Sequence, residues 1–396
     1  MTGYQTDPSP WTRFRRHLTK GILFVAGAAA LTLAAPAAMA ADFQKEWAEL
    51  VAAAKKEGVV SIAAGGAPSR NYQGVFEAFK KKYGIRVEVS RGGANSTISR
   101  VLAERKTGKY TMDVALISVR INNQRLVPSE SLIPFEPLLI HPEVLDKSKW
   151  YGGHYWYGDK FTKYTFFYTA GVIDGLRFWY NTEKVSAKDI ATIKTPGDLL
   201  DPKWKSKIVA QAMEDPSGIR QMIDSWQTEG MGPDWVRKFI TEAGVTFSAD
   251  RRILETWLVG GRFPIKAPTG AEEELRTLAQ KGIPIKEGVI PAKEGMLRAS
   301  GSGCCISAFK NAPHPNAAKL FINWFLTREG QTLIHTTIPN LSVSSLRNDI
   351  PFGHVIEEQR RTPGKKYLYP DSDPESGARN KKIQDEIMKI WESRKR

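Results

Sequence analysis

Hydrophobic residues in the first part of the chain alternate between helical spacing and the short apolar runs of buried strands. The spacing predicts helices over residues 43–58, 72–84 and 96–110, and the apolar runs predict strands over 59–66, 85–93 and 112–118. In the second of these helices, Val75, Phe76 and Phe79 fall on one face. Because helices and strands alternate, the pattern predicts a parallel sheet with helices on both faces.

The middle of the chain has a different pattern. Residues 141–185 are rich in aromatic residues, favour strands, and end in a strand predicted over 175–180. Helix and strand patterns resume over residues 194–282 and include a helix predicted over 220–244. The sequence therefore predicts an α/β protein with two lobes joined through long strands.

The N-terminus has the three parts of an export signal. A basic start is followed by an apolar run over residues 21–33 and by Ala38, Met39 and Ala40, small residues typical of a cleavage site. The run is too short for a membrane anchor and is broken by Pro36. We therefore expect residues 1–40 to be a cleaved signal peptide and the mature protein to lie in the periplasm. Arg15–Arg16 leaves export by the twin-arginine route open beside the general route.

Composition adds little about the fold but bears on the partners. The chain is 41% hydrophobic and 25% charged, which is ordinary for a globular protein, and its formal net charge is +15. Lys and Arg are scattered among Asp and Glu, so the excess favours a solvated basic surface or attraction of a small anion. Nucleic acid is not an expected partner, and we expect a monomer.

Five segments in a fixed order resemble a known family. They are "FKKKYGIRVEVSRGGANSTISRVLAERKTGKYTMDVALIS", "HPEVLDKSKW", "LRFWYNTEKV", "TPGDLLDPKWKSKI" and "NAPHPNAAKLFINWFLTREGQ". Over residues 57–331 the chain resembles the extracellular solute-binding proteins of ABC transporters, in the branch that contains the ferric-iron binders. The resemblance implies a type II periplasmic binding protein fold, in which two doubly wound α/β lobes joined by a strand hinge close on a small-molecule solute. It also implies delivery of the solute to a cognate ABC permease in the inner membrane.

This fold implies a division of the chain. The first lobe would comprise residues 41–178 plus about 284–340, and the second lobe residues 179–283. Residues 341–396 would form a C-terminal segment that packs on the lobes, and the sequence does not assign it to either one.

Strand-to-helix junctions are the candidate solute contacts, because ligands of doubly wound sheets bind at the carboxyl ends of the strands. Glycines, hydroxyls and a guanidinium at such places suit a carboxylate or phosphate, although each junction can also be an ordinary turn or helix cap. The first-lobe candidates are Gly66, Arg91, Gly92, Gly93, Ser96, Thr97 and Ser118, and the second-lobe candidates are Ser217 and Thr269. Tyr180 belongs to a "YN" pair that looks like the hinge motif of the family.

Iron is a weaker interpretation of the same cleft. The family's iron binders typically use two adjacent tyrosines of the second lobe, but the matching segment "APTGAEEELRTLAQKG" contains none. We therefore expect no metal site and no cofactor, and we expect a small, anionic organic solute. Ferric iron or a ferric chelate is the alternative.

No nucleophile, phosphate or zinc motif indicates an enzyme. A periplasmic hydrolase is a remote alternative, because catalytic residues can converge from distant segments.

The sequence allows two interpretations of each of two further features. Trp156, Tyr164, Phe167, Tyr168 and Trp179 would either wall an organic ligand or fill the core beneath the hinge. Cys304 and Cys305 lie on the predicted return strand into the first lobe and point to opposite faces, so they cannot jointly hold a metal. Two buried thiols are the favoured state of this pair and a vicinal disulfide is the alternative, and in this stretch the turn at 300–303 is the candidate for contact with the solute.

Overall fold

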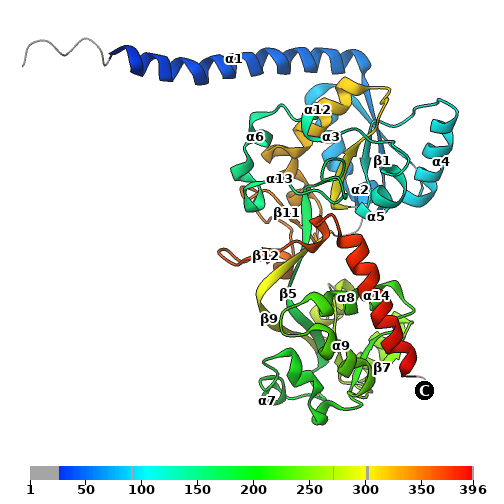
Figure 1. The fold of residues 1–396 in the computed structure, drawn as a ribbon. Helices are drawn as coiled ribbons and strands as arrows, with labels where there is room; N and C mark the ends of the chain where they lie inside the picture. Colours follow the sequence, from blue (N-terminus) through cyan, green and yellow to red (C-terminus); the bar gives the residue numbers. More distant parts are fainter. Residues whose placement is uncertain (1–25, 91, 271, 300–302, 395–396) are drawn as a thin grey trace, which may run out of the picture. The chain divides into compact units, whose positions relative to one another are not determined.

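The computed structural model describes residues 26–90, 92–270, 272–299 and 303–394 (Figure 1). The chain divides into two compact units, residues 1–49 and residues 50–396. Helix α1 (Ala26–Glu57) runs through the predicted cleavage position, and the basic start of the predicted signal peptide lies outside the described residues. No helix among the described residues combines the length and the apolar character needed to cross a membrane.

The first sheet has the order β2-β1-β3-β10-β4. Its parallel strands β1 (Val59–Ala64), β2 (Arg86–Val89) and β3 (Val114–Leu116) lie within the ranges expected from the sequence. Strand β10 (Cys305–Ala308) runs antiparallel to β3 and to β4 (Phe166–Phe167). The helices of this part are α2 (Gly66–Asn71), α3 (Gln73–Tyr83), α4 (Ala94–Lys106), α5 (Val119–Ile121), α6 (Pro142–Leu145), α12 (Pro315–Leu326) and α13 (Arg328–Thr337).

Helix α3 illustrates why these elements form where they do. Val75, Phe76 and Phe79 are buried on one face, as their spacing predicts. The helix ends at Gly84, whose φ of 73° is left-handed and whose N–H donates to the carbonyl of Lys80.

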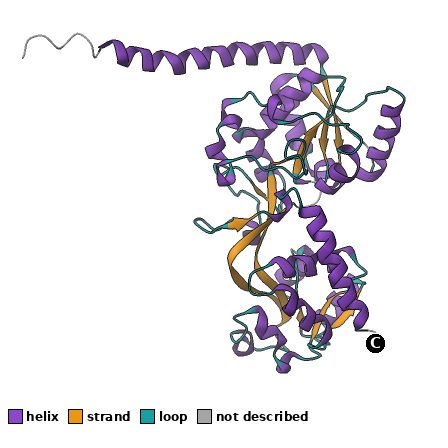
Figure 2. Cartoon of the chain, in the orientation of Figure 1, coloured by secondary structure: helices purple, strands orange, loops and turns teal. Residues whose placement is uncertain are grey.

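The second sheet has the order β12-β9-β5-β8-β6-β7, and β11 pairs with β5 outside this path. Its two long strands, β5 (Thr169–Asn181) and β9 (Ile285–Arg298), are antiparallel (Figure 2). The short strands are β6 (Ile208–Gln211), β7 (Thr246–Ser248), β8 (Ile265–Lys266), β11 (Ser344–Ser345) and β12 (Tyr367–Leu368). The helices are α7 (Ala187–Ile190), α8 (Pro216–Gln227), α9 (Gly232–Thr241), α10 (Arg251–Val259), α11 (Glu273–Gln280) and α14 (Ser376–Ser393).

The helix predicted over residues 220–244 is two helices, α8 and α9. Gly230, between the two helices, and Gly232, the first residue of α9, both have a left-handed φ of 81°, and Pro233 follows. The apolar periodicity on either side of this break is helical, so periodicity alone could not separate the two helices.

The C-terminal segment contacts both sheets. The ring of Tyr369 stacks on that of Phe167 in β4 of the first sheet, and the strand pairings of the segment are with the second sheet. Ser344 and Ser345 pair with the start of β5, and Tyr367 and Leu368 pair with β9. Helix α14 then packs against α8 and α9, and its Trp391 lies in the hydrophobic core beneath the second sheet. The segment that the sequence left unassigned therefore ends on the second sheet.

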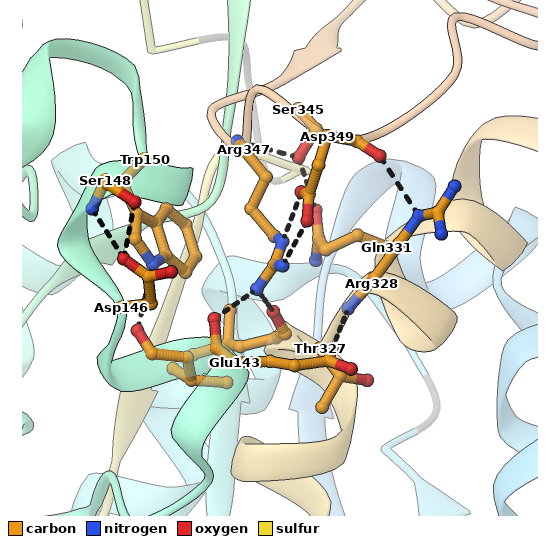
Figure 3. Close-up of polar contacts among 12 residues, drawn as sticks. Glu143, Asp146, Ser148, Trp150, Thr327, Arg328, Gln331, Ser345, Arg347 and Asp349 are labelled. Atoms are coloured by element: carbon orange, nitrogen blue, oxygen red, sulfur yellow. Dashed lines mark hydrogen bonds and ion pairs between the residues drawn. The ribbon is translucent and has the colours of Figure 1, made fainter. Parts of the chain in front are cut away.

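Arg347 holds the first part of this segment in place (Figure 3). Its side chain, only 2% exposed, makes two parallel hydrogen bonds to Asp349, with Nε–Oδ1 and Nη2–Oδ2 distances of 2.9 and 2.7 Å. Nη1 donates to the carbonyl oxygens of Glu143 (2.8 Å) and Leu326 (3.1 Å). One guanidinium thus ties three separate stretches of chain together.

His335 is a second buried polar group of this region. Its side chain is 1% exposed, its Nδ1 lies 2.7 Å from the carbonyl oxygen of Gln331, and its Nε2 has no hydrogen-bond partner within the described part of the chain. Burial lowers the pKa of His335 from 6.5 to about 4. The folded protein therefore holds this imidazole neutral where the unfolded chain would protonate it.

Replacing Arg347 by methionine should lower the free energy of unfolding by about 3 kcal/mol, the lower end of the cost of breaking a buried ion pair, because Asp349 is partly exposed. Urea denaturation at pH 7 measures the loss. Arg328→Met is the matched control, since Arg328 is exposed and reaches the same loop through the carbonyl of Asp349. Equal losses of unfolding free energy in the two variants would contradict the anchoring role of Arg347.

Stability should fall as the pH drops from about 6.5 to about 4, by up to roughly 3 kcal/mol from His335 alone, because the unfolded state binds the proton more readily. His335→Gln should flatten this part of the stability profile in denaturant titrations at pH 7, 5.5 and 4.5. His354→Gln, at an exposed histidine, should leave the profile as it is. If the His335 variant lost stability with falling pH as steeply as the unaltered protein, His335 would not be the cause of that loss.

Candidate functional site

A cavity of about 490 Å³ lies at the carboxyl edge of the parallel strands of the second sheet. Its wall includes the start of β5, one face of α8, which follows β6, and residues 268–270, which follow β8. Doubly wound sheets bind ligands at this edge. The polar lining of the cavity includes Arg177, Arg220, Asp224, Thr269 and Arg298.

Arg298 is the most buried charge in the wall, at 5% exposure. It pairs with Asp224 of α8, and its Nη1 lies 3.2 Å from Oδ1 of Asp371. Arg220 contacts the same two carboxylates, with Nε 3.1 Å from Asp224 Oδ1 and Nη2 3.3 Å from Asp371 Oδ2. Two arginines and two aspartates thus form one charge-balanced network.

Burial dominates the electrostatics of this network. It raises the pKa of Asp224, although Arg298 and Arg220 both act to lower it. Arg220 has the most exposed side chain of the four, at 41%. Arg220 is therefore the member of the network that a solute in the cavity reaches most easily.

Two polar atoms of the wall lack hydrogen-bond partners within the described residues, Thr269 Oγ1 and Arg298 Nε. A buried polar group without a partner costs about 1–3 kcal/mol. Both atoms are fully enclosed, so this cost persists unless a movement of the wall brings them a partner.

Of the second-lobe candidates, Thr269 alone lines this cavity. Ser217 lies in the first turn of α8, where its backbone N–H donates to the capping carboxylate of Asp215 at 2.7 Å. Tyr180 lies near the far end of β5, opposite Ile265, and its ring packs against Phe178. Neither of these two reaches the 490 Å³ cavity.

The described first-lobe candidates lie along one edge of the first sheet, because β2, β1 and β3 are adjacent and parallel. None of these described candidates lines the 490 Å³ cavity. Arg91 and the 300–302 part of the predicted turn lie outside the described residues. Their positions are as follows: Gly66 begins α2, Gly92, Gly93 and Ser96 are exposed, Thr97 is 2% exposed, and Ser118 caps α5. Ser96 Oγ donates to the carbonyl of Gly93 at 2.8 Å, a local turn bond.

The charged network was not anticipated from the sequence. Arg220 and Asp224 are four residues apart on a helix, a common surface pair, so their spacing carried no functional signal. Arg298 and Asp371 are 73 residues apart, and only the pairing of β12 with β9 brings them together.

Most of the five aromatic residues considered as a possible ligand wall lie in the hydrophobic core. Phe167 and Tyr168 are fully buried and Trp179 is 2% exposed, so these three cannot stack on a solute. Tyr168 packs edge-on against Phe325, and Trp179 lies in a cluster with Leu258. The interpretation as core filler is therefore correct for these three residues, whereas Trp156 and Tyr164 are half-buried.

The donor atoms of the cavity do not suit a bare ferric ion. Ferric iron prefers anionic oxygen ligands. The described lining residues include no tyrosine and no histidine, and the single carboxylate among them, Asp224, is held by two arginines. In the described ranges no three His, Cys, Asp or Glu side chains are grouped to hold a metal.

Cys304 and Cys305 form a vicinal disulfide, which was the alternative to the favoured pair of thiols. Both residues are fully buried where β10 begins, and Cys305 pairs with Phe167 of β4. The carbonyl of Cys304 accepts from the N–H of Tyr168, one residue before β5. The pair therefore lies where two connections between the sheets come together.

A family model for bacterial extracellular solute-binding proteins matches residues 74–348 of the chain. A search of curated protein sequences finds no match to this chain.

Solved structures show the same fold at low sequence identity. Iron-bound HitA from Pseudomonas aeruginosa is 16% identical, with 83% of this chain and 98% of that chain covered and a TM-score of 0.51. FutA (IdiA) from Trichodesmium, in complex with iron and citrate, is 18% identical, with 84% and 99% covered and a TM-score of 0.56. Ferric iron-binding protein A from Mannheimia haemolytica, in an open conformation, is 12% identical, with 84% and 98% covered and a TM-score of 0.58. These matches confirm the predicted α/β periplasmic binding fold.

Proposed function

Because the chain belongs to the family of bacterial extracellular solute-binding proteins, we propose that it serves an ABC importer by capturing a small, anionic organic solute. The solute would bind in the 490 Å³ cavity beside α8 and the start of β5. The family is one of exported binding proteins of transporters, which argues against the periplasmic hydrolase.

The arginines of the cavity wall are the observation that carries this proposal. Among the described lining residues three of the four charged side chains are arginines, Arg177, Arg220 and Arg298, and Asp224 is the fourth. Glu287 and Asp371 balance their charge from outside the lining, so the arginines offer hydrogen-bond donors more than net charge. A guanidinium binds a carboxylate or phosphate through two parallel hydrogen bonds. The enclosed Nε of Arg298 and the enclosed hydroxyl of Thr269 become further groups for such a solute where a movement of the wall exposes them.

The first lobe would add contacts when the two lobes close on the solute. We propose the exposed junction at Gly92, Gly93 and Ser96 for this role, because it lies at the start of α4 and at the carboxyl end of β2. The lobe boundaries, cleavage after residue 40, the monomeric state and docking on an inner-membrane permease are further parts of the proposal.

Iron remains the second candidate in the form of a chelate. HitA and FutA carry iron in their solved structures. A bare ferric ion lacks tyrosine ligands in this cavity, but the outer carboxylates of a ferric chelate would meet the same arginines.

The test is a thermal-shift and scattering experiment on the mature chain, residues 41–396. Succinate, citrate, glycerol 3-phosphate and ferric citrate are compared with glycerol as the uncharged control. An acidic solute at 100 times its dissociation constant should raise the free energy of unfolding by about 2.7 kcal/mol, and small-angle scattering should show compaction. Stabilisation by ferric citrate alone would favour the chelate, and equal stabilisation by glycerol would contradict the preference for anions.

Thr269→Val tests the site itself, because it removes one hydroxyl and keeps the shape of the side chain. It should weaken binding of the acidic solute about tenfold, the effect of one hydrogen bond to a charged group. Thr241→Val is the matched control, at an exposed threonine of α9 outside the cavity. Unchanged affinity in the Thr269 variant would place the solute elsewhere.

A further inference from the structure

A second cavity, of about 270 Å³, lies beside the C-terminal segment. It is lined by parts of residues 344–352 and 361–367, together with Tyr151 and His335, and it shares no lining residue with the 490 Å³ cavity. Three of its lining residues are cationic, namely Arg347, Arg361 and Lys365, and no Asp or Glu is found among the described residues that line it. The 490 Å³ cavity, by contrast, includes a carboxylate in its wall.

Two of the three cations have carboxylate partners just outside the cavity. Arg347 is held by both oxygens of Asp349, and Lys365 Nζ lies 2.5 Å from Oδ1 of Asp174. His335 adds no positive charge at neutral pH, because burial lowers its pKa to about 4. The uncompensated charge of this cavity is therefore that of Arg361.

Arg361 forms no ion pair with a carboxylate within the described part of the chain. Its Nη1 donates to the carbonyl oxygen of Ser345, and its Nη2 donates to that of Arg347 at 3.4 Å. The guanidinium stands 5.1 Å from the ring centre of Tyr151. A guanidinium has five N–H donors and stays protonated in proteins, so these contacts leave donors and a full charge without a partner.

We propose that Arg361 is the anchor of a second binding site, which takes a small oxyanion of the carboxylate or phosphate type. The guanidinium supplies the charge and the remaining N–H donors, and the 270 Å³ volume, room for roughly nine water-sized groups, limits the ligand to a small organic acid or a phosphate. Pro351, Phe352 and Pro363 form an apolar part of the wall, which suits the short hydrocarbon portion of an organic acid. Burial lowers the pKa of Arg361, and an anion beside it would oppose that effect.

Arginine modification tests the site on the unaltered mature chain. Phenylglyoxal labels accessible guanidinium groups, and peptide mass spectrometry follows the label on Arg361. Sodium propionate or inorganic phosphate, at ten times its dissociation constant, should slow labelling of Arg361 about tenfold, whereas sodium chloride at equal ionic strength should not. Labelling at the same rate in all three salts would overturn the proposal. Protection by propionate alone, or by phosphate alone, identifies which of the two oxyanions the site takes.

Variants separate this site from the proposed solute site. Arg361→Met should weaken calorimetric binding of the protecting anion by roughly tenfold or more, because hydrogen bonds to a charged group are lost. Arg360→Met is the matched control, at an exposed neighbour outside the cavity lining, and Thr269→Val should also leave this binding unchanged. Binding that survives in Arg361→Met but is lost in Thr269→Val would assign the anion to the solute site and overturn the second one.

Discussion

The antiparallel pairing of β5 with β9 is the constraint on which the rest of this molecule depends. The pairing runs from Gly171 opposite Arg298 to Asn181 opposite Ile285, with a shift in register between Ile173 and Gly175. Gly175 has a φ of 133°, and a Cβ there would lie 2.0 Å from the carbonyl oxygen of Ile290. The bulge therefore requires glycine. Strands β8, β11 and β12 all pair with one of these two strands, so an error in this register would displace both ends of the second sheet.

The same pairing sets the chemistry of the 490 Å³ cavity. It places the start of β5 in the wall and brings Arg298, at the end of β9, next to α8. The pairing of β12 then delivers Asp371 to Arg298 from the C-terminal segment. A buried network of this kind adds little net stability, because desolvation offsets the attraction. Its larger effect is to fix the C-terminal segment, β9 and α8 in one mutual arrangement.

The sequence was most informative where the physical signal is local. Helical and strand periodicity located the three parallel strands of the first sheet, because burial on one face repeats within a few residues. Thr269 was found for a similar reason, since it follows a strand at the carboxyl edge. Arg298, Asp224 and Asp371 could not be found this way. Their side chains meet only after strands distant in sequence have paired in one particular register, and neither local pattern nor spacing encodes that register.

The two cavities differ in whether carboxylates neutralise their arginines, and this difference determines what each can bind. In the 490 Å³ cavity Arg220 and Arg298 are already ion-paired with Asp224 and Asp371. An incoming acid must therefore match the geometry of these contacts as well as their charge, and a poorly shaped anion gains little over the carboxylates in place. Arg361 has no such competitor among the described residues, so its cavity selects by size and charge alone. Arginines that are already ion-paired suit a selective solute site. Arg361, which has no carboxylate partner among the described residues, suits a general oxyanion site.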